Sequence, residues 1–172
     1  MRRSTEGRIL VVSDANVLIN FLRANRLDLL SQHREYKIHV TEHVRAEITY
    51  PEQKSDLDAA ISSGDIEEVP LTDPVEVELF VELNAVLGRG ESAAIALASN
   101  RRWVIAIDEL GRARSEARRR VGSDRVINTP GLILSCVRSG ALTIAEADGI
   151  KASLESQGQS FSTSFGSFGE LL

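Results

Sequence analysis

The sequence predicts an α/β fold with three layers, in which helices cover both faces of a mainly parallel sheet. Short apolar, β-branched runs alternate along the chain with longer segments of helical periodicity. Neither an internal repeat nor an interdomain linker interrupts this order. Such alternation is typical of a parallel sheet whose strands are joined by crossover helices.

The strands are expected at the apolar runs. Residues 8–13 (RILVVS) predict a fully buried strand, because the run is short, β-branched and ended by a polar residue. Residues 36–40 (YKIHV) alternate like a second strand, and residues 66–71 predict a short edge strand. A buried strand is expected at residues 103–107 (WVIAI), and a last short strand at residues 125–127.

Helix signals lie between these runs. Thr41 is a good N-cap residue, and Asp73 before Pro74 has the cap-then-proline order expected where a helix begins. Leu110, Ala113, Ala117 and Val121 are expected on one apolar helix face. Helical character is therefore expected over residues 17–30, another helix is expected to start at residues 73–74, and further helices are expected at residues 41–48, 52–63, 91–98, 110–121, 130–137 and 143–154.

We expect one domain over residues 1–172, with a core at about residues 8–156. Residues 158–172 are rich in Ser, Gly and Phe, and could form a short helix or a tail. Phe161, Phe165, Phe168 and Leu171 or Leu172 fall at helix-compatible spacing, which favours a short helix that docks its apolar side.

Composition excludes several classes of protein. The 172 residues suffice for one core, and 42% apolar with 26% charged residues is ordinary for a soluble globular protein. No apolar run approaches the roughly 18 residues of a membrane span, so no membrane partner is expected. The start of the chain is basic, but the apolar run at residues 9–12 is too short for a signal-peptide core. A cytoplasmic location is therefore expected.

The single cysteine, Cys136, lies in the apolar stretch LILSCV. It can form no intrachain disulfide, and its surroundings predict a buried core thiol rather than a nucleophile.

The formal net charge of −5 does not indicate a nucleic-acid binder. The charge is uneven, however, because eight arginines lie between residues 101 and 125. This cluster is either a solvated helix face or a patch that contacts phosphates. For the second reading the expected contacts are Arg112, Arg118 and Arg119.

Four acidic residues lie where apolar runs end or helices begin: Asp14, Glu47, Glu91 and Asp108. Asp14 and Asp108 each follow a predicted strand, and parallel sheets bind ligands at the carboxyl ends of their strands. Carboxylates gathered there without a basic partner become favourable when a hard divalent cation neutralises them. The pattern predicts a Mg²⁺ or Mn²⁺ site and phosphoryl chemistry. Taken singly, each acid could instead be a helix cap or an exposed helix residue.

Four segments carry a family resemblance: residues 13–19 (SDANVLI), 44–48 (VRAEI), 88–98 (GRGESAAIALA) and 106–109 (AIDE). In order and spacing they resemble the acidic motifs of the PIN domain, a family that includes the VapC-type toxins of toxin–antitoxin pairs. The resemblance extends from about residue 9 to residue 154, and its first and third motifs are the more specific.

This resemblance implies that Asp14, Glu91 and Asp108 bind the metal and that Glu47 binds it or orients a water molecule. It also implies supporting roles for Asn16, Glu109 and Thr129. Asn16 would help to order the site, Glu109 could be an alternative ligand, and Thr129 would supply a site hydroxyl. The chain departs from the family pattern where Ala15 replaces a common threonine or serine, and where Asn128 precedes Thr129 in place of glycine.

The activity that the resemblance implies is that of an endoribonuclease, a Mg²⁺- or Mn²⁺-dependent phosphodiester hydrolase acting on RNA. It further implies the toxin half of a type II toxin–antitoxin pair, which forms a homodimer and is silenced by a small antitoxin. Two alternatives are left open: a PIN-like RNA- or protein-binding module without significant catalysis, and a nuclease that is not paired with an antitoxin.

Other phosphate-handling classes fit poorly. A haloacid-dehalogenase-like phosphatase needs a second aspartate two residues after the first, and Asn16 occupies that position. A response-regulator receiver needs a lysine near the end of a late strand, whereas Lys151 falls in a predicted helix.

Two further ligand sites are also disfavoured. Gly88-x-Gly90 lacks the third glycine of a dinucleotide motif and follows no strand. His39 and His43 straddle a strand–helix junction without a third zinc ligand nearby.

Overall fold

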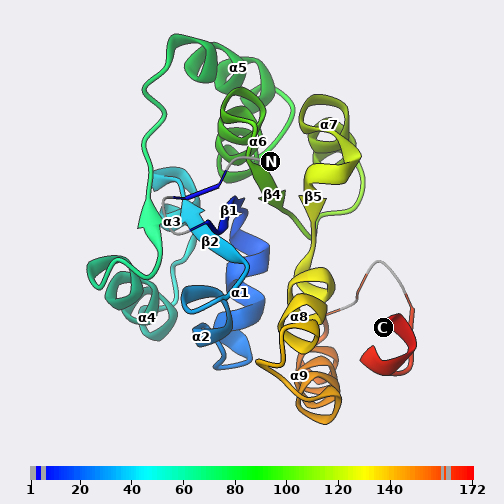
Figure 1. Cartoon of the computed structure of the whole chain (residues 1–172). Helices are drawn as coiled ribbons and strands as arrows, with labels where there is room; N and C mark the ends of the chain where they lie inside the picture. The colour runs from blue at the N-terminus through cyan, green and yellow to red at the C-terminus, as the bar shows by residue number, and fades with distance from the viewer. Residues whose placement is uncertain (1–2, 5–6, 160, 162–163) are drawn as a thin grey trace.

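The computed structural model describes residues 3–4, 7–159, 161 and 164–172. Within them, five parallel strands form one sheet in the order β3-β2-β1-β4-β5, between two groups of helices (Figure 1). The strands are β1 (Ile9–Ser13), β2 (Tyr36–Val40), β3 (Glu67–Glu68), β4 (Val104–Ala106) and β5 (Val126–Ile127). The prediction of a three-layer α/β fold with a parallel sheet is therefore confirmed.

The edge strand β3 is shorter than the sequence predicts. Its ladder covers Glu67 and Glu68 only, and one further hydrogen bond joins the Val69 N–H to Val40 O at 2.8 Å. Pro70 follows, and it has no N–H to donate to a ladder. The expected strand at residues 66–71 therefore ends early.

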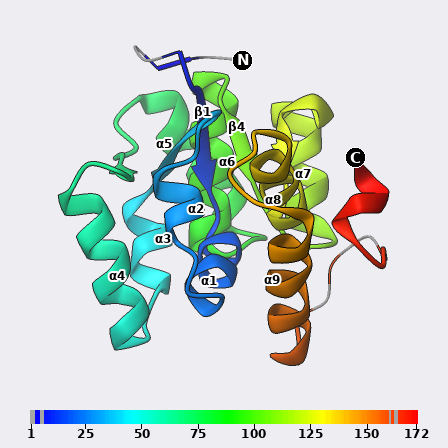
Figure 2. The same ribbon diagram turned by 60° about the horizontal axis from the view of Figure 1, so that its bottom comes forward.

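One face of the sheet is covered by helices from both halves of the chain. Figure 2 shows α1, α2, α8 and α9 in front of the strands. With α4 they enclose the larger apolar core, in which Phe21, Ile38 and Leu132 are buried. The helices of this face are α1 (Ala15–Arg23), α2 (Asp28–Ser31), α4 (Pro51–Ser62), α8 (Thr129–Arg138) and α9 (Ile144–Ser156).

The other face carries α5 (Pro74–Asn84), α6 (Arg89–Arg101) and α7 (Arg112–Val121), which lie together in Figure 1. Alanines dominate α6, and their small side chains let it lie close to the sheet, so residues 92–98 are all buried. A short helix, α3 (Glu42–Glu47), follows β2 and packs against α6. As expected, Thr41 caps α3: its side chain accepts the Val44 N–H.

The apolar face expected over residues 110–121 is correct except at its start. Ala113, Ala117 and Val121 are buried under α7, but Leu110 is 55% exposed. Gly111 has φ 95°, a conformation that favours glycine, and it turns the chain before α7 begins at Arg112. Leu110 is thereby left outside the helix.

The end of the chain docks on the larger core. Phe168 is fully buried and Phe165 nearly so, and a short 3₁₀ helix, η2 (Phe168–Leu171), forms at the end of the predicted segment. The carboxylate of Asp148 on α9 accepts the Phe168 N–H at 2.8 Å and the Ser167 hydroxyl at 2.7 Å. Residues 160, 162 and 163 of the predicted segment lie outside the described residues.

This docking predicts a clear difference between two tail substitutions. Phe168→Ala empties a buried position, so it should lower the free energy of unfolding by about 3–5 kcal/mol. Leu172→Ala is the control, because Leu172 is 60% exposed and should change stability by less than about 0.5 kcal/mol. Urea unfolding followed by circular dichroism measures both. Equal, small effects would mean that the tail does not contribute to the core.

Candidate active site

The candidate site lies at the point in the sheet where the strand order reverses. The chain continues from β1 towards β2 on one side and from β4 towards β5 on the other, so β1 and β4 flank a topological switch point. Asp14 directly follows β1, and its N–H donates to Ala106 O, the last residue of β4, at 2.9 Å. Asp108 lies two residues beyond β4. Both aspartates therefore lie at the same edge of the sheet, as the sequence predicts.

Asp14 is the most deeply buried of the four acids, at 1% exposure. It is the N-cap of α1, and its Oδ2 accepts the Asn16 N–H at 3.4 Å. Burial raises its pKa from 3.8 to about 7, against hydrogen bonds from the Ala15 and Asn16 backbone, and the charges of Glu91 and Glu47 raise it further. Asn16 thus supports the site through its backbone, while its side chain is exposed.

Glu47 and Glu91 meet at the N-terminus of α6. Glu47 Oε1 accepts the Gly90 N–H at 2.8 Å, and Glu91 Oε2 accepts the Gly88 N–H at 3.1 Å. A Cβ added to Gly90 would lie 2.7 Å from both carboxylate oxygens of Glu47. A side chain at position 90 would therefore displace the Glu47 carboxylate, so glycine leaves the Gly90 N–H open to it.

The environment of Glu91 also disfavours its charged form. Partial burial raises its pKa, and the charges of Glu109 and Glu47 raise it further. Glu109 is exposed, so it acts on Glu91 through charge at the rim of the site. Asp14, Glu47, Glu91 and Glu109 therefore form one group of mutually repelling carboxylates.

Asp108 is held by a separate set of hydrogen bonds. The Thr129 N–H donates to its Oδ1 at 2.8 Å, and the Thr129 hydroxyl donates to its Oδ2 at 2.5 Å. Asn20 Nδ2 also donates to Oδ2, at 2.8 Å. Thr129 is the first residue of α8 and fully buried. It lies beside an acid of the site, where the family pattern expects its hydroxyl.

Asn20 is the residue that sequence reasoning missed. It is 2% exposed and joins α1 to Asp108, 88 positions away along the chain. A signal was present, because Asn20 interrupts the apolar side of α1 that Val17, Phe21 and Leu22 build. A polar side chain on a buried helix face needs a partner, and here that partner is a site acid.

The donors suit a hard divalent cation, but their present orientations do not form a cage. Repelling carboxylates around a buried Asp14 are the ligand type that Mg²⁺ and Mn²⁺ prefer. Within the described residues, no group of three or more His, Cys, Asp or Glu is placed to hold a metal ion. Glu47 and Glu91 instead accept backbone N–H groups. The residues fit the metal by chemistry, and their side chains would have to turn towards it.

The three arginines expected to contact RNA lie on α7, at different distances from the acids. Arg112 is the first residue of α7, four residues after Asp108. Because α7 joins the parallel strands β4 and β5, it runs back towards their amino ends. Arg118 and Arg119 in its last turn therefore lie about 9–10 Å further along the helix axis, and Arg119 pairs with Glu116 at 2.6 Å.

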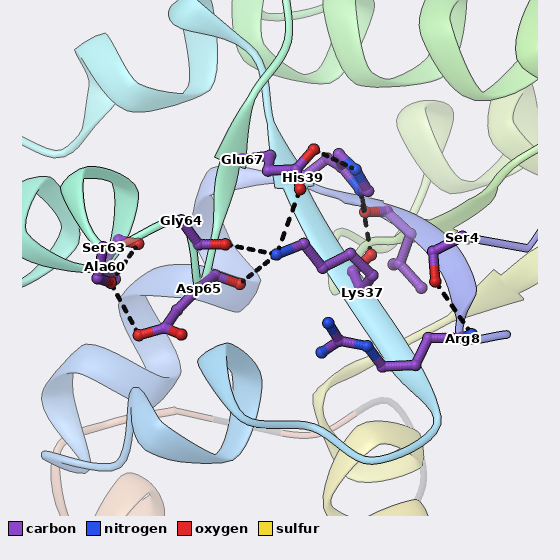
Figure 3. Close-up of polar contacts among 10 residues, drawn as sticks. Ser4, Arg8, Lys37, His39, Ala60, Ser63, Gly64, Asp65 and Glu67 are labelled. Atoms are coloured by element: carbon purple, nitrogen blue, oxygen red, sulfur yellow. Dashed lines mark hydrogen bonds and ion pairs between the residues drawn. The ribbon is translucent and has the colours of Figure 1, made fainter. Parts of the chain in front are cut away.

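A cavity of about 410 Å³, away from the acids, has both Lys37 and His39 in its wall. Both side chains have partners within the protein. Lys37 Nζ donates to Gly64 O at 2.5 Å and lies 3.3 Å from Glu67, and His39 Nε2 lies 3.4 Å from the same carboxylate (Figure 3). These contacts anchor the edge strand β3. His43 is elsewhere, stacked on Phe80, so the two histidines do not share a ligand site.

Comparison with known proteins agrees with the family that the sequence resembles. A family model described as a PIN domain matches residues 10–162. Because this match spans most of the chain, the protein belongs to the PIN domain family.

A search of curated proteins found no significant match. Among solved structures, the chain is similar to one described as the crystal structure of VapBC2 from Rickettsia felis bound to a DNA fragment from their promoter. The two are 16% identical with a TM-score of 0.48, and the likeness covers 70% of this chain and 98% of that chain. A likeness at this level carries no functional conclusion. No helix among the described residues is both long and apolar enough to cross a bilayer.

Burial of Asp14 predicts how stability depends on pH. Its pKa is raised from 3.8 to about 7, so between these values the folded state keeps a proton that the unfolded chain releases. Without metal, stability should therefore fall as pH rises from about 4 to about 7. Asp14→Asn keeps the N-cap and removes the buried charge. It should be more stable than wild type by a few kcal/mol at about pH 8, with little difference at about pH 4.

Chemical denaturation in EDTA across this pH range measures the effect. Asp56→Asn is the matched control, because Asp56 is an exposed carboxylate on α4, and it should follow the wild-type profile. Superimposable pH profiles for wild type and Asp14→Asn would contradict the strained burial of Asp14.

Proposed function

We propose that this protein is a Mg²⁺- or Mn²⁺-dependent endoribonuclease and the toxin of a type II toxin–antitoxin pair. Membership of the PIN domain family supports the nuclease class. The observation that carries the metal dependence is the burial of Asp14 beside the charges of Glu91 and Glu47, with a pKa of about 7. Such an arrangement is costly for the protein alone and favourable with a cation.

In this proposal Asp14, Glu91 and Asp108 hold the ion, and Glu47 holds it or orients a water molecule. A bound divalent ion lowers the pKa of water and offsets charge on the leaving 3′-oxygen, which supplies the chemistry of phosphodiester hydrolysis. The resemblance to VapC-type toxins is what favours RNA as the substrate. The site needs no Ser, Cys or His nucleophile, and burial raises the pKa of Cys136 to about 11, which keeps that thiol inert.

The remaining residues orient the acids. Asn20 and Thr129 fix the Asp108 carboxylate from two helices. Gly88 and Gly90 hold Glu91 and Glu47 through their N–H groups, from which both side chains would turn towards a bound ion. Because Asp14 has a pKa of about 7, it must lose a proton to bind metal, so metal affinity should rise with pH through this value.

The partners belong to the same proposal. A small antitoxin would silence the enzyme by placing its tail in the acidic pocket, and a basic tail would complement the charges of Asp14, Glu47 and Glu91. The active form would be a cytoplasmic homodimer. These assignments follow the resemblance to VapC-type toxins.

One observation favours a second candidate, a PIN-like binding module without significant catalysis. Glu47 and Glu91 accept backbone N–H groups, and no preformed group of three metal-holding residues exists among the described residues. A nuclease that acts without an antitoxin differs only in its partner.

Metal titration separates the first two candidates. Mg²⁺ or Mn²⁺ should raise the melting temperature with concentration, by the equivalent of about 2.7 kcal/mol at a hundredfold excess over the Kd. Asp14→Asn should abolish this rise and the metal-dependent cleavage of RNA. Asp56→Asn, which removes an exposed carboxylate on α4, should keep both. A metal response that persists in Asp14→Asn refutes the ligand assignment, and a response without RNA cleavage in wild type favours the binding module.

Charge reversal on α7 tests the RNA-binding surface. Arg112→Glu should weaken RNA binding and reduce the slope of log K against log salt by about one unit, because one phosphate contact is lost. Arg118→Glu with Arg119→Glu should weaken binding less, since these residues lie in the far turn of α7. Fluorescence anisotropy at several salt concentrations measures both. If both variants bind RNA as the wild type does at low salt, α7 is not the RNA-binding surface.

A further inference from the structure

A cavity of about 550 Å³ lies directly beside the acids. It is lined by Glu42, His43, Ala46 and Glu47 of α3 and by Arg89 of α6. Glu47 belongs both to this cavity and to the carboxylate group, so the two spaces adjoin. The volume falls within the range of about 300–1,000 Å³ that is typical of small-molecule sites.

The wall of the cavity contains an oriented aromatic ring. His43 stacks on Phe80 of α5, with ring centroids 4.7 Å apart and planes only 4° from parallel. The His43 side chain is 18% exposed. Because Phe80 supports one face of the ring and His43 lines the cavity, a planar group inside the cavity can stack on the histidine. His43 and Glu47 are four residues apart on α3, and therefore occupy the same helix face on successive turns.

Arg89 supplies a free positive charge in the same cavity. It is exposed, and it makes no hydrogen bond or ion pair with any residue that the structure describes. Two arginines on this side of the sheet are engaged by contrast: Arg101 pairs with Glu76 at 2.6 Å, and Arg120 pairs with Glu116 at 3.1 Å. Arg89 also stands between Gly88 and Gly90, whose N–H groups hold the two glutamates of the site.

We propose that this cavity binds the nucleotide next to the cleaved phosphate of a single-stranded RNA, with its base against His43 and its phosphate on Arg89. An aromatic platform beside an unpaired cation is the combination that binds single strands. The carboxylates of Glu42 and Glu47 would repel a phosphate placed against α3, so the base occupies that side. Glu42 can accept a hydrogen bond from an exocyclic amino group of the base. This inference rests on the proposed ribonuclease function and names two of its substrate-binding residues.

The test measures binding apart from cleavage. A fluorescein-labelled, single-stranded oligoribonucleotide of mixed sequence is titrated with the full chain in EDTA, where metal-dependent cleavage cannot proceed. We expect Arg89→Gln to weaken binding at least about fivefold and to lower the salt slope by about one unit. His43→Ala should weaken binding at least about fivefold, the loss of one stacked base, and His43→Phe should restore it.

A matched control comes from the end of the same helix. Arg102→Gln removes an exposed arginine at the opposite end of α6, about 20 Å from Arg89, and should bind RNA as wild type does. In steady-state cleavage with Mn²⁺, Arg89→Gln should raise KM more than it lowers kcat, because it removes binding and not chemistry. Arg89 is exposed, so its variant tests the proposal even where His43→Ala fails to fold.

The outcomes separate this proposal from the ribonuclease function. Wild-type binding by Arg89→Gln, in an enzyme that cleaves RNA, overturns the nucleotide site and leaves the nuclease standing. Weakened binding by Arg89→Gln and His43→Ala, in a protein that never cleaves RNA, supports the site and overturns the nuclease. Failure of the wild-type protein to bind the oligoribonucleotide in EDTA overturns the nucleotide site, and cleavage of RNA with Mn²⁺ decides the nuclease separately.

Discussion

Repulsion between the buried carboxylate of Asp14 and the neighbouring charges of Glu91 and Glu47 is the constraint on which this structure depends. The N-termini of three helices offset this repulsion with hydrogen bonds: α1 donates an N–H to Asp14, α6 donates to Glu47 and Glu91, and α8 donates to Asp108. Backbone N–H groups at helix starts carry partial positive charge and stabilise anions. The compensation is incomplete, because Asp14 still has a pKa of about 7. The protein thus gathers negative charge that it can tolerate but not fully neutralise, which is the condition that favours a cation.

Sheet topology explains why these helices converge. The chain leaves β1 towards β2 and leaves the adjacent β4 towards β5, on opposite sides of the sheet. The helices that follow these two strands therefore diverge and open a crevice at the carboxyl edge. Asn20 closes the gap between the two halves by reaching from α1 to Asp108. The same arrangement lets α3 serve two spaces, because Glu47 faces the acids while His43, one turn earlier, lines the neighbouring cavity. Chemistry and substrate binding would then share the rigid contact between α3 and α6.

Local patterns in the sequence predicted much of this, since strands, caps and the positions of Asp14, Glu91 and Asp108 depend on near neighbours in the chain. Contacts between distant residues were not predictable in the same way. The bond from Gly90 to Glu47 spans 43 positions, and that from Asn20 to Asp108 spans 88. Arg118 and Arg119 seemed close to the acids in sequence, but the return direction of α7 carries them away. Pro70 and Gly111 shortened elements whose apolar pattern continued through them.

The most direct test of the account is a measurement of the Asp14 pKa itself, by carboxyl ¹³C NMR in metal-free protein. The account predicts a value of about 7, against an ordinary 3.8, and a downward shift when Glu91→Gln removes a neighbouring charge. A titration near the ordinary value that is indifferent to Glu91→Gln would contradict it, because the carboxylates would then lie too far apart, or too well solvated, to need a common cation.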